Sequence, residues 1–404
     1  MAVCTGCSLL CEDIELVGGT SHAKNLCRKG WAHFQSLYTE RTKPTIEDQD
    51  ATLDGAIAKA SEILANAKKP LLYGWSNSTL EAQAAGIELA KKIGAALEGT
   101  TSLGQCTLME QVLTGKIPSC TLDDVRNYAD TSVFWGADPS NSHPRHLSRF
   151  SYYPRGEKHQ KSYEEERSCV AIDVRKSSTA TLCSNYFYRL PPGTDDQFIE
   201  SIMAALDGKI PKFGDKKRMI ELGTLLRKTE YGALFPGRGL VYSLQEKMDL
   251  LQKLIAKLSE ITAFKVVPMV EHYNTRGFNQ LLLDETGFIN SVSFHDGAAV
   301  HGPMQSMIEA ARSCDAALVI GSDPLSSLPF GIARALAKKP LIAIDPRRSL
   351  TTDAAKVVIP SAMCGFEAGG TALRMDGVKI AFDSVIKGDM QSDEQILARI
   401  KEAI

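Results

Sequence analysis

Four cysteines near the start of the chain have the residue type and spacing of a metal site. Cys4, Cys7, Cys11 and Cys27 follow the pattern C-x2-C-x3-C-x15-C. Three thiolates from one short segment and a fourth from further along are typical of a cubic iron-sulfur cluster, because each iron takes one sulfur ligand. A four-thiolate zinc site, which prefers two C-x2-4-C pairs, and unligated thiols are the alternatives. The spacing predicts a 4Fe-4S cluster on these cysteines.

Composition and charge indicate the cellular compartment of the protein and the classes of partner that it does not bind. The net charge is -2, and no run of Lys and Arg is dense enough for a nucleic-acid or anionic-membrane surface. No apolar run approaches the roughly 18 to 20 residues that cross a bilayer, and the first residues do not form a signal peptide. We therefore expect a cytoplasmic protein that binds neither nucleic acid nor a membrane. Cytoplasmic thiols stay reduced, which favours ligands over disulfides.

The remaining chain must position these cysteines and any further site. At 404 residues with 44% hydrophobic content, it is long enough for about two or three domains with sizeable cores. Helical periodicity over 52–68 precedes a buried strand at 70–76, and a helix over 79–94 begins at a Thr cap. Residues 131–142 read as a strand followed by a turn. This alternation predicts an α/β fold with parallel sheets covered on both faces.

An internal repeat marks the ends of four such strands. VFWGADPSNS (133–142) is echoed by LVIGSDPLSS (318–327), and VAIDVRKSSTA (170–180) by IAIDPRRSLTT (342–352). Small, acidic and basic residues at the carboxyl ends of parallel strands are typical of nucleotide sites. A turn signal without a ligand is the alternative interpretation of G-x-D-P. The repeat predicts two nucleotide-like sites, with the candidate residues Gly136, Asp138, Asp173 and Arg175 in the first half and Gly321, Asp323, Asp345 and Arg347 in the second.

Two further segments are candidates for ligand contact. The run Pro-Gly-Thr-Asp precedes a helix, with Thr194 or Asp195 as the cap, and a capped helix without a ligand is the alternative. The Gly-rich stretch 359–377 has the composition of a loop that closes over a ligand. We expect an iron-sulfur module over 1–45, a first Rossmann-like domain over 46–205 with connecting helices over 206–235, and a second such domain with a C-terminal cap over 236–404.

Several of these segments together resemble one family. They are CTGCSLLCEDI, LCRKG, LLYGWSNSTLEAQAAGIELA, CTLDDVRNYADTSVFWGADPSNSHPRHLSR, EHYNTRGFNQ and GTALRMDGV. From Cys4 onwards the chain resembles the B subunit of formylmethanofuran dehydrogenase, in the molybdopterin oxidoreductase superfamily. The resemblance places Lys29, just after the fourth cysteine, between cluster and pterin.

The resemblance implies cofactors, partners and a reaction. The cofactors are a tungsten or molybdenum ion held by two pyranopterin guanine dinucleotides, one per repeat half, and a 4Fe-4S cluster that passes electrons to partner subunits. The Pro-Gly-Thr-Asp element resembles a guanine-contacting element. The reaction is reduction of carbon dioxide to formate, and a separate, amidohydrolase-like A subunit joins formate to methanofuran.

The chain departs from the family at the reacting centre. The Cys-His pair of the family, a metal ligand and a proton-transfer residue, falls on Gly104 and Gln105. A two-residue slip would bring in Cys106 as the ligand. The catalytic Arg falls on Val300, within FHDGAAVHGP (294–303). His295 and His301 are the substitutes nearest in sequence to that position.

In lacking these groups, the chain resembles the B-like subunit of the bacterial formyltransferase/hydrolase complex. That complex moves a formyl group from a tetrahydromethanopterin carrier to a methanofuran-type carrier and releases formate. The resemblance implies a scaffold in a hetero-oligomer whose other members are an amidohydrolase-like A subunit, a C subunit and a formyltransferase-like D subunit. The alternatives are an active tungsten or molybdenum protein with catalytic Cys106, and a different molybdopterin oxidoreductase without a protein ligand to the metal.

Overall fold

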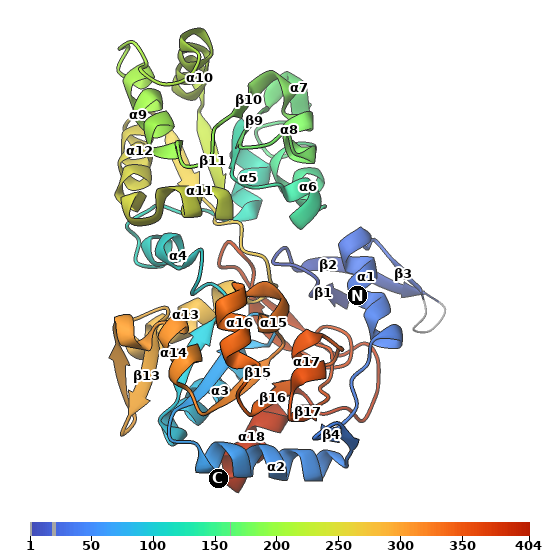
Figure 1. Cartoon of the computed structure of the whole chain (residues 1–404). Helices are drawn as coiled ribbons and strands as arrows, with labels where there is room; N and C mark the ends of the chain where they lie inside the picture. Colours follow the sequence, from blue (N-terminus) through green and yellow to red (C-terminus); the bar gives the residue numbers. More distant parts are fainter. Residues whose placement is uncertain (1, 18–21, 162) are drawn as a thin grey trace. The chain divides into compact units, whose positions relative to one another are not determined.

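A computed structural model describes residues 2–17, 22–161 and 163–404, which divide into two compact units (Figure 1). The split unit comprises 1–103 and 272–404, and the inserted unit comprises Gly104–Glu271. The expectation of consecutive domains with a boundary near residues 206–235 is therefore corrected. The chain leaves the split unit after its second parallel strand, builds the inserted unit, and returns to complete the first sheet.

The inserted unit is built on a five-stranded parallel sheet of order β10-β9-β8-β11-β12. Its strands are β8 (Thr131–Trp135), β9 (Ser168–Asp173), β10 (Phe187–Arg189), β11 (Tyr231–Pro236) and β12 (Ala263–Val266). Its helices are α4 (Cys106–Leu113), α5 (Leu122–Tyr128), α6 (Pro139–Ser142), α7 (Tyr163–Glu166), α8 (Ser178–Leu182), α9 (Asp195–Leu206), α10 (Lys216–Lys228), α11 (Arg238–Leu244) and α12 (Met248–Ile261). The strand order reverses between β8 and β11, the kind of position where open α/β sheets bind ligands.

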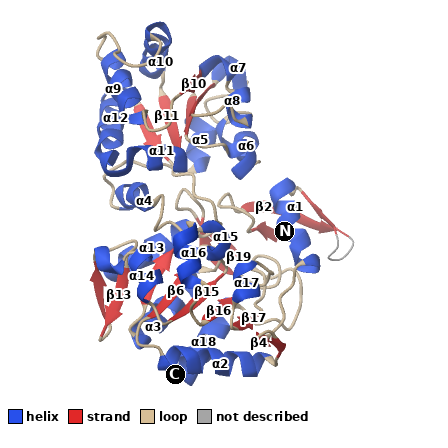
Figure 2. Cartoon of the chain, viewed as in Figure 1, coloured by secondary structure: helices blue, strands red, loops and turns tan. Residues whose placement is uncertain are grey.

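Both faces of this sheet are covered, as Figure 2 shows. On one face, Val133 and Trp135 of β8 pack with apolar residues of α9, α10 and α12. On the other, Phe134 stacks on Phe235 at 5.1 Å and meets the buried ring of His146. Because both faces are apolar, β8 is buried throughout its length, as parallel strands usually are.

The split unit holds a nine-stranded sheet of order β14-β13-β7-β6-β15-β16-β17-β4-β5, parallel from β7 to β17 and antiparallel at both edges. Its strands are β4 (Thr45–Ile46), β5 (Gln49–Asp50), β6 (Pro70–Gly74), β7 (Ala96–Gly99), β13 (Val292–His295), β14 (Ala298–His301), β15 (Ala316–Ile320), β16 (Leu341–Ile344) and β17 (Val357–Ile359). Its strand order reverses between β6 and β15.

Smaller sheets and nine α-helices complete the described part of this unit. The smaller sheets are β1 (Ala2–Cys4), β2 (Cys11–Val17) and β3 (His22–Lys24), and the hairpin β18 (Gly370–Leu373) and β19 (Lys379–Phe382). The helices are α1 (Arg28–Thr39), α2 (Leu53–Asn66), α3 (Leu80–Ile93), α13 (Thr275–Thr286), α14 (Met307–Ser313), α15 (Pro324–Ser327), α16 (Phe330–Leu336), α17 (Leu350–Ala354) and α18 (Asp393–Ala403).

The period of two along each strand sorts the core of the split unit into two layers. Leu72 and Leu318 face the apolar residues of α2, α3 and α18, whereas Tyr73 and Val319 face those of α14 and α16. The helices predicted over 52–68 and 79–94 are confirmed as α2 and α3, with Thr52 and Thr79 as side-chain caps. Within 359–377, expected to be a loop, 370–373 form strand β18.

A membrane span would require a long helix of apolar residues. Within the described ranges, no helix is both long and apolar enough to cross a bilayer.

Candidate functional site

The four predicted ligands lie together in the small module formed by β1, β2, β3 and α1. Cys4 and Cys11 are paired across the antiparallel strands β1 and β2, with Cys7 in the turn between them. Cys27 is the N-cap of α1, where its Sγ accepts a hydrogen bond from the N–H of Gly30 at 3.3 Å. Cys4, Cys7 and Cys11 are buried. The fold thus brings Cys27 next to the three cysteines of the first segment.

The electrostatics of this module favour ligation over unliganded thiolates. Burial raises the pKa of the Cys7 thiol to about 12, and the neighbouring thiols of Cys11 and Cys27 add to the rise, while the charge of Lys29 opposes it. Burial and the charge of Cys7 likewise raise the pKa of Cys4. Thiolates crowded in a buried place are stable only when a cation compensates them, so the module fits a group that carries positive charge.

Two glycines leave room beside these sulfur atoms. A Cβ on Gly30 would lie 3.0 Å from Cys4 Sγ and 3.7 Å from Cys27 Sγ, and one on Gly6 would lie 3.4 Å from Cys4 Sγ. Among the described residues, no three His, Cys, Asp or Glu side chains converge on one point as ligands of a single ion. Four thiolates in one module are the donor set that a 4Fe-4S cluster takes, one for each iron, and a four-thiolate zinc ion takes the same number.

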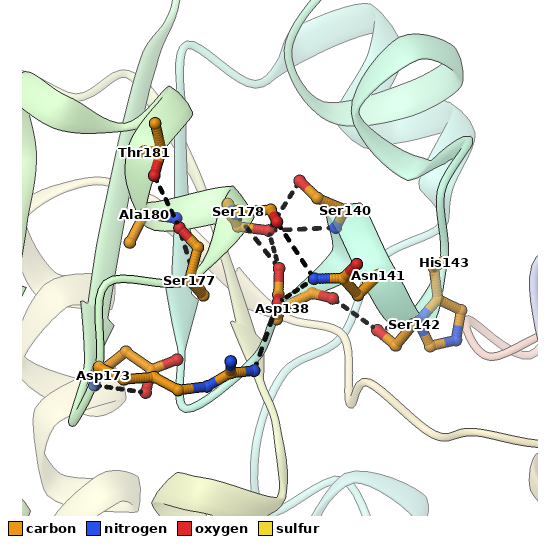
Figure 3. A network of polar contacts seen from close by, with 12 residues as sticks. Asp138, Ser140, Asn141, Ser142, His143, Asp173, Ser177, Ser178, Ala180 and Thr181 are labelled. Atoms are coloured by element: carbon orange, nitrogen blue, oxygen red, sulfur yellow. Dashed lines mark hydrogen bonds and ion pairs between the residues drawn. The ribbon is translucent and has the colours of Figure 1, made fainter.

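The first repeat half forms a hydrogen-bonded clasp at the carboxyl end of β8 (Figure 3). Oδ1 of Asp138 accepts from the backbone N–H of Thr179 at 3.2 Å and from its hydroxyl at 2.7 Å. Oδ2 of Asp138 accepts from Asn141 at 2.6 Å and lies 3.5 Å from the guanidinium of Arg175. Oδ1 of Asp173 accepts from the backbone N–H of Arg175 at 3.2 Å. All four predicted residues of this half are therefore near one another.

The second half repeats the clasp in the split unit. Oδ1 of Asp323 accepts from the backbone N–H of Thr351 at 3.0 Å and from its hydroxyl, while Oδ1 of Asp345 accepts from the N–H of Arg347 at 2.8 Å. The backbone angles agree as well: φ and ψ are -124° and 74° at Asp138, and -119° and 74° at Asp323. The repeat found in the sequence is thus a repeat in structure. Thr179 and Thr351 were not predicted, although the S-x-T that contains each is part of the repeat.

The repeated glycines serve loop packing at both switch points. Gly136 has φ 58°, and a Cβ there would lie 2.4 Å from the backbone nitrogen of Leu240. The loop after β11 is equally close, because Gly239 N–H donates to Gly136 carbonyl oxygen at 3.2 Å. In the second half, Gly321 has φ 52° and its carbonyl accepts from the amide of Asn77 at 2.8 Å. The glycines are required by these close approaches, whatever ligand binds beside them.

A polar hollow lies at the carboxyl end of β16 in the split unit. Its volume is about 30 Å³, room for a water molecule or two, and it is lined in part by Asp345, Arg347, His33 and Asp393. Burial raises the pKa of Asp345 to about 7, partly offset by Arg347, and raises that of Asp393 to about 6. Burial lowers the pKa of His33 to about 3, and its Nε2 lies 2.9 Å from the hydroxyl of Thr5. At neutral pH the hollow therefore presents a neutral imidazole and a carboxyl near its titration point.

Thr194 and Asp195 lie at the start of α9 but do not cap it with their side chains. The Thr194 hydroxyl donates to the carbonyl of Pro191 at 2.7 Å, and the buried carboxylate of Asp195 accepts from the indole N–H of Trp135 at 2.6 Å. Thr194 is the N-cap residue of α9, as expected, although its side chain makes no capping hydrogen bond. Because Trp135 ends β8, Asp195 instead ties α9 to the strand that carries the first repeat.

The positions aligned with the metal ligand and its histidine lie at the start of the inserted unit. Gln105 is buried, and its amide donates to the carbonyl of Met269 at 2.9 Å. Cys106 is the first residue of α4 and is half-buried. The structure therefore gives Gln105 a packing role in the connection between the ends of this unit.

The positions aligned with the catalytic arginine lie on the hairpin of β13 and β14. Val300 is 37% exposed on β14, the end strand of the sheet, which pairs with β13. His301 stacks on Phe288 with ring centroids 4.2 Å apart, and its Nδ1 lies 3.0 Å from the carbonyl of Asn290. His295 is exposed at the end of β13. His301 is thus held by local contacts of this hairpin.

Comparison with known proteins finds relatives along nearly the whole chain, although no family model matches. The B subunit of tungsten-containing formylmethanofuran dehydrogenase 2 from Methanocaldococcus jannaschii is 32% identical over 406 residues, covering 95% of this chain and 93% of that one. The protein of the same name from Methanococcus maripaludis is 31% identical, covering 98% and 96%.

One solved structure has the same fold. A chain of the formyltransferase/hydrolase complex FhcABCD from Methylorubrum extorquens, solved with methylofuran, superposes with a TM-score of 0.70. The match covers 89% of this chain and 98% of that chain at 21% sequence identity. At this identity, the likeness establishes the fold of the chain.

Proposed function

The chain belongs to the family of the formylmethanofuran dehydrogenase B subunit, and from this premise we propose that it is a scaffold without a redox reaction of its own. It acts in one-carbon metabolism within a cytoplasmic hetero-oligomer that transfers a formyl group from a tetrahydromethanopterin carrier to a methanofuran-type carrier and releases formate. Its partners are an amidohydrolase-like A subunit, a C subunit and a formyltransferase-like D subunit.

The environment of Gln105 carries this proposal. A proton-transfer residue needs a titratable side chain that faces the substrate. Gln105 has no titratable group, and its buried amide donates a hydrogen bond to the carbonyl of Met269. Gly104 before it supplies no side chain that ligates a metal. In this alignment the loop offers neither the metal ligand nor the proton-transfer residue that the redox reaction of the family uses.

The hairpin of β13 and β14 supports the same conclusion. Val300 offers no positive charge to a carboxylate, and a site for formate or carbon dioxide without a cation loses most of its electrostatic stabilisation. His301 is engaged by Phe288 and by the carbonyl of Asn290, so it does not replace the missing arginine.

The cysteine module supports retention of a 4Fe-4S cluster in this scaffold. Cys4, Cys7, Cys11 and Cys27 would hold it, and the space left by Gly6 and Gly30 lies beside two of the four sulfur atoms. When bound, the cluster accepts and donates single electrons. The residues of the chain supply four thiolates, burial, and the nearby charge of Lys29, which favours the anionic form of Cys7.

The two clasps are the candidate sites for pterin dinucleotides. Oδ1 of each of the four acidic residues accepts a hydrogen bond from these loops, and Oδ2 of Asp138 also accepts from Asn141, so loop order does not depend on a ligand. Arg175 and Arg347 supply positive charge at these loops, and the hollow beside Asp345 adds buried hydrogen-bonding groups. Arg347 and Asp345, at the carboxyl end of β16, are the residues that would contact a dinucleotide at the second clasp, a structural use that needs no metal chemistry.

The second candidate function is an active tungsten or molybdenum protein that reduces carbon dioxide to formate. Both relatives are named as tungsten-containing, and Cys106 is a half-buried thiol two residues from the aligned ligand position. In this case Cys106 would be the protein ligand of the metal, as a soft thiolate suits such an ion.

One experiment separates the two functions. Tungsten, molybdenum, iron and pterin are measured in the purified complex, and formyl transfer, formate release and carbon dioxide reduction are assayed for the wild type and Cys106→Ser. The scaffold function predicts neither tungsten nor molybdenum in stoichiometric amount and unchanged formyl transfer in the variant. About one tungsten or molybdenum per chain, together with carbon dioxide reduction that Cys106→Ser abolishes, would overturn it.

A further inference from the structure

Two cysteines of the inserted unit lie in contact outside the module described above. The Sγ atoms of Cys169 and Cys183 are 2.7 Å apart. Both side chains are buried, with 5% and 3% of their surfaces exposed. Such a separation is well below the contact distance of two non-bonded sulfur atoms, and only about 0.7 Å more than the length of a disulfide bond.

Regular backbone structure holds each of these cysteines in place. Cys169 is the second residue of β9, between β8 and β10, and its register partner on β8 is Ser132. Cys183 is the C-cap residue of α8, where its N–H donates to the carbonyl of Thr179 at 3.0 Å. The two sulfur atoms therefore meet because α8 packs back on β9. Their approach is a property of the sheet and helix and does not depend on a mobile loop.

We propose that Cys169 and Cys183 form a reversible redox pair that closes to a disulfide when hydrogen peroxide oxidises it. One sulfur attacks the peroxide, so that an S–O bond forms, the O–O bond breaks and the first water leaves. The second sulfur then displaces the hydroxyl of this sulfenic acid as a second water, and the S–S bond forms. Two thiols and one hydrogen peroxide thus yield one disulfide and two waters, with the peroxide reduced by two electrons.

The segment between the two cysteines gives the oxidation a structural consequence. It contains Asp173 and Thr179, the latter being the residue that holds Asp138 through its N–H and hydroxyl. A covalent bond from the start of β9 to the end of α8 closes this segment at its base. Oxidation therefore stabilises the first clasp against unfolding, because it restricts the unfolded chain.

Burial determines how fast and how selectively the pair reacts. The pKa of the Cys169 thiol is raised well above its ordinary value by burial and by the neighbouring Cys183. Thiols of this kind react slowly until the structure opens locally, and a small oxidant reaches them before a bulky disulfide does. Cys314 is also a buried thiol, but its Sγ lies 3.6 Å from the backbone carbonyl of Ala311 and, among the described residues, is not paired with a second thiol as Cys169 is.

Peptide mapping of the full-length protein tests this proposal. The protein is treated with hydrogen peroxide, alkylated while denatured, and digested with trypsin, which cuts after Arg167, Arg175, Lys176 and Arg189. Peptides 168–175 and 177–189 each then contain one cysteine of the pair. The expected result is that they are linked after oxidation and separate after dithiothreitol. If both are recovered unlinked and alkylated, or are linked only to cysteines of other peptides, the proposal is wrong.

Thermal unfolding of the peroxide-treated protein and variants supplies a second measurement. The disulfide is expected to raise the Tm of the inserted unit by roughly 6 to 12 °C relative to the same sample in dithiothreitol. Cys183→Ser should lose this difference, whereas the control Cys314→Ser should keep it. An equal difference in Cys183→Ser would show that another cysteine is responsible and would overturn the assignment.

Discussion

Asp138 and Thr179 are joined twice, because the Thr179 backbone N–H and hydroxyl both donate to the same carboxylate oxygen, at 3.2 and 2.7 Å. Asp323 and Thr351 repeat this relationship in the other unit. In each case an acidic residue after one parallel strand fixes the short helix after the next strand. The clasp therefore couples two neighbouring strand ends, where the candidate ligand sites lie.

Removal of one clasp hydroxyl should lower the stability of its unit. Thr179→Val keeps the backbone bond but leaves the carboxylate of the half-buried Asp138 with one donor fewer. A hydrogen bond to a charged group contributes about 1.5 to 3 kcal/mol, so the free energy of unfolding should fall by about that amount. Urea unfolding measures the change. The matched control is Thr181→Val on the same helix, whose hydroxyl bonds the carbonyl of Ser177; an equal loss there would contradict the special role of the clasp.

Gly30→Ala should reduce the iron content of the purified protein. The new Cβ would lie 3.0 Å from Cys4 Sγ and 3.0 Å from a methyl group of Leu26, so Cys4 must move. We expect a loss of at least about half of the bound iron, because displaced ligands weaken a metal site by 10-fold or more. Iron and sulfide analysis with visible absorption follows the cluster. Gly331→Ala, where the Cβ meets nothing within 4 Å, should keep the wild-type iron content.

Glu98 should make the protein less stable as pH rises. The carboxyl is buried, its Oε2 accepts from the Ser102 hydroxyl, and burial raises its pKa to about 8. In the unfolded chain it ionises near pH 4.3, so between roughly pH 4.3 and 8 the folded state binds more protons. Stability contributed by the protonated form is therefore present below this window and is lost as pH rises through it.

The measurement is the free energy of unfolding of the wild type and Glu98→Gln at pH 5 and pH 8. The slope due to one such group is at most about 1.4 kcal/mol per pH unit, and Gln should remove it. Asp345, whose pKa is about 7, adds a decline of the same sign in both proteins. If wild type and variant show the same pH dependence, Glu98 is ionised in the folded protein and the prediction fails. The exposed Glu62→Gln is the control.

Gln105→Met should destabilise the inserted unit while Gln280→Met should not. Methionine has a similar length but leaves the carbonyl of Met269 without its donor, which costs about 1 to 3 kcal/mol. The amide of Gln280 bonds only the exposed Asp284, so its loss should cost less than about 0.5 kcal/mol. Denaturant unfolding of both variants checks this. A neutral Gln105→Met would mean that this residue has no packing role and would weaken the scaffold proposal.

Local patterns in the sequence were sufficient for several parts of the molecule. Helical periodicity and a Thr cap located α3, and the run of apolar residues located β8, because both signals depend on neighbours within a few residues. The cysteine spacing located a module in which the four residues do come together. The clusters and dinucleotides that these patterns suggest stay predictions.

Relationships between distant residues were decided by tertiary structure. The spacing of motifs along the chain cannot show that 104–271 is inserted into another sheet, because strand order is set by which apolar faces pack. For the same reason Asp195 meets Trp135 instead of capping its own helix.

The sequence by itself determined the family, the alternating elements, the repeat and the cysteine cluster, since each is a pattern of residue types along the chain. Only the folded chain decided that Thr179 and Thr351 bind the repeated aspartates, that Gln105 is used for packing, and that Cys169 meets Cys183. These contacts arise where strand ends and helix ends approach, and their geometry is fixed by the packing of whole layers, which no short stretch of sequence encodes.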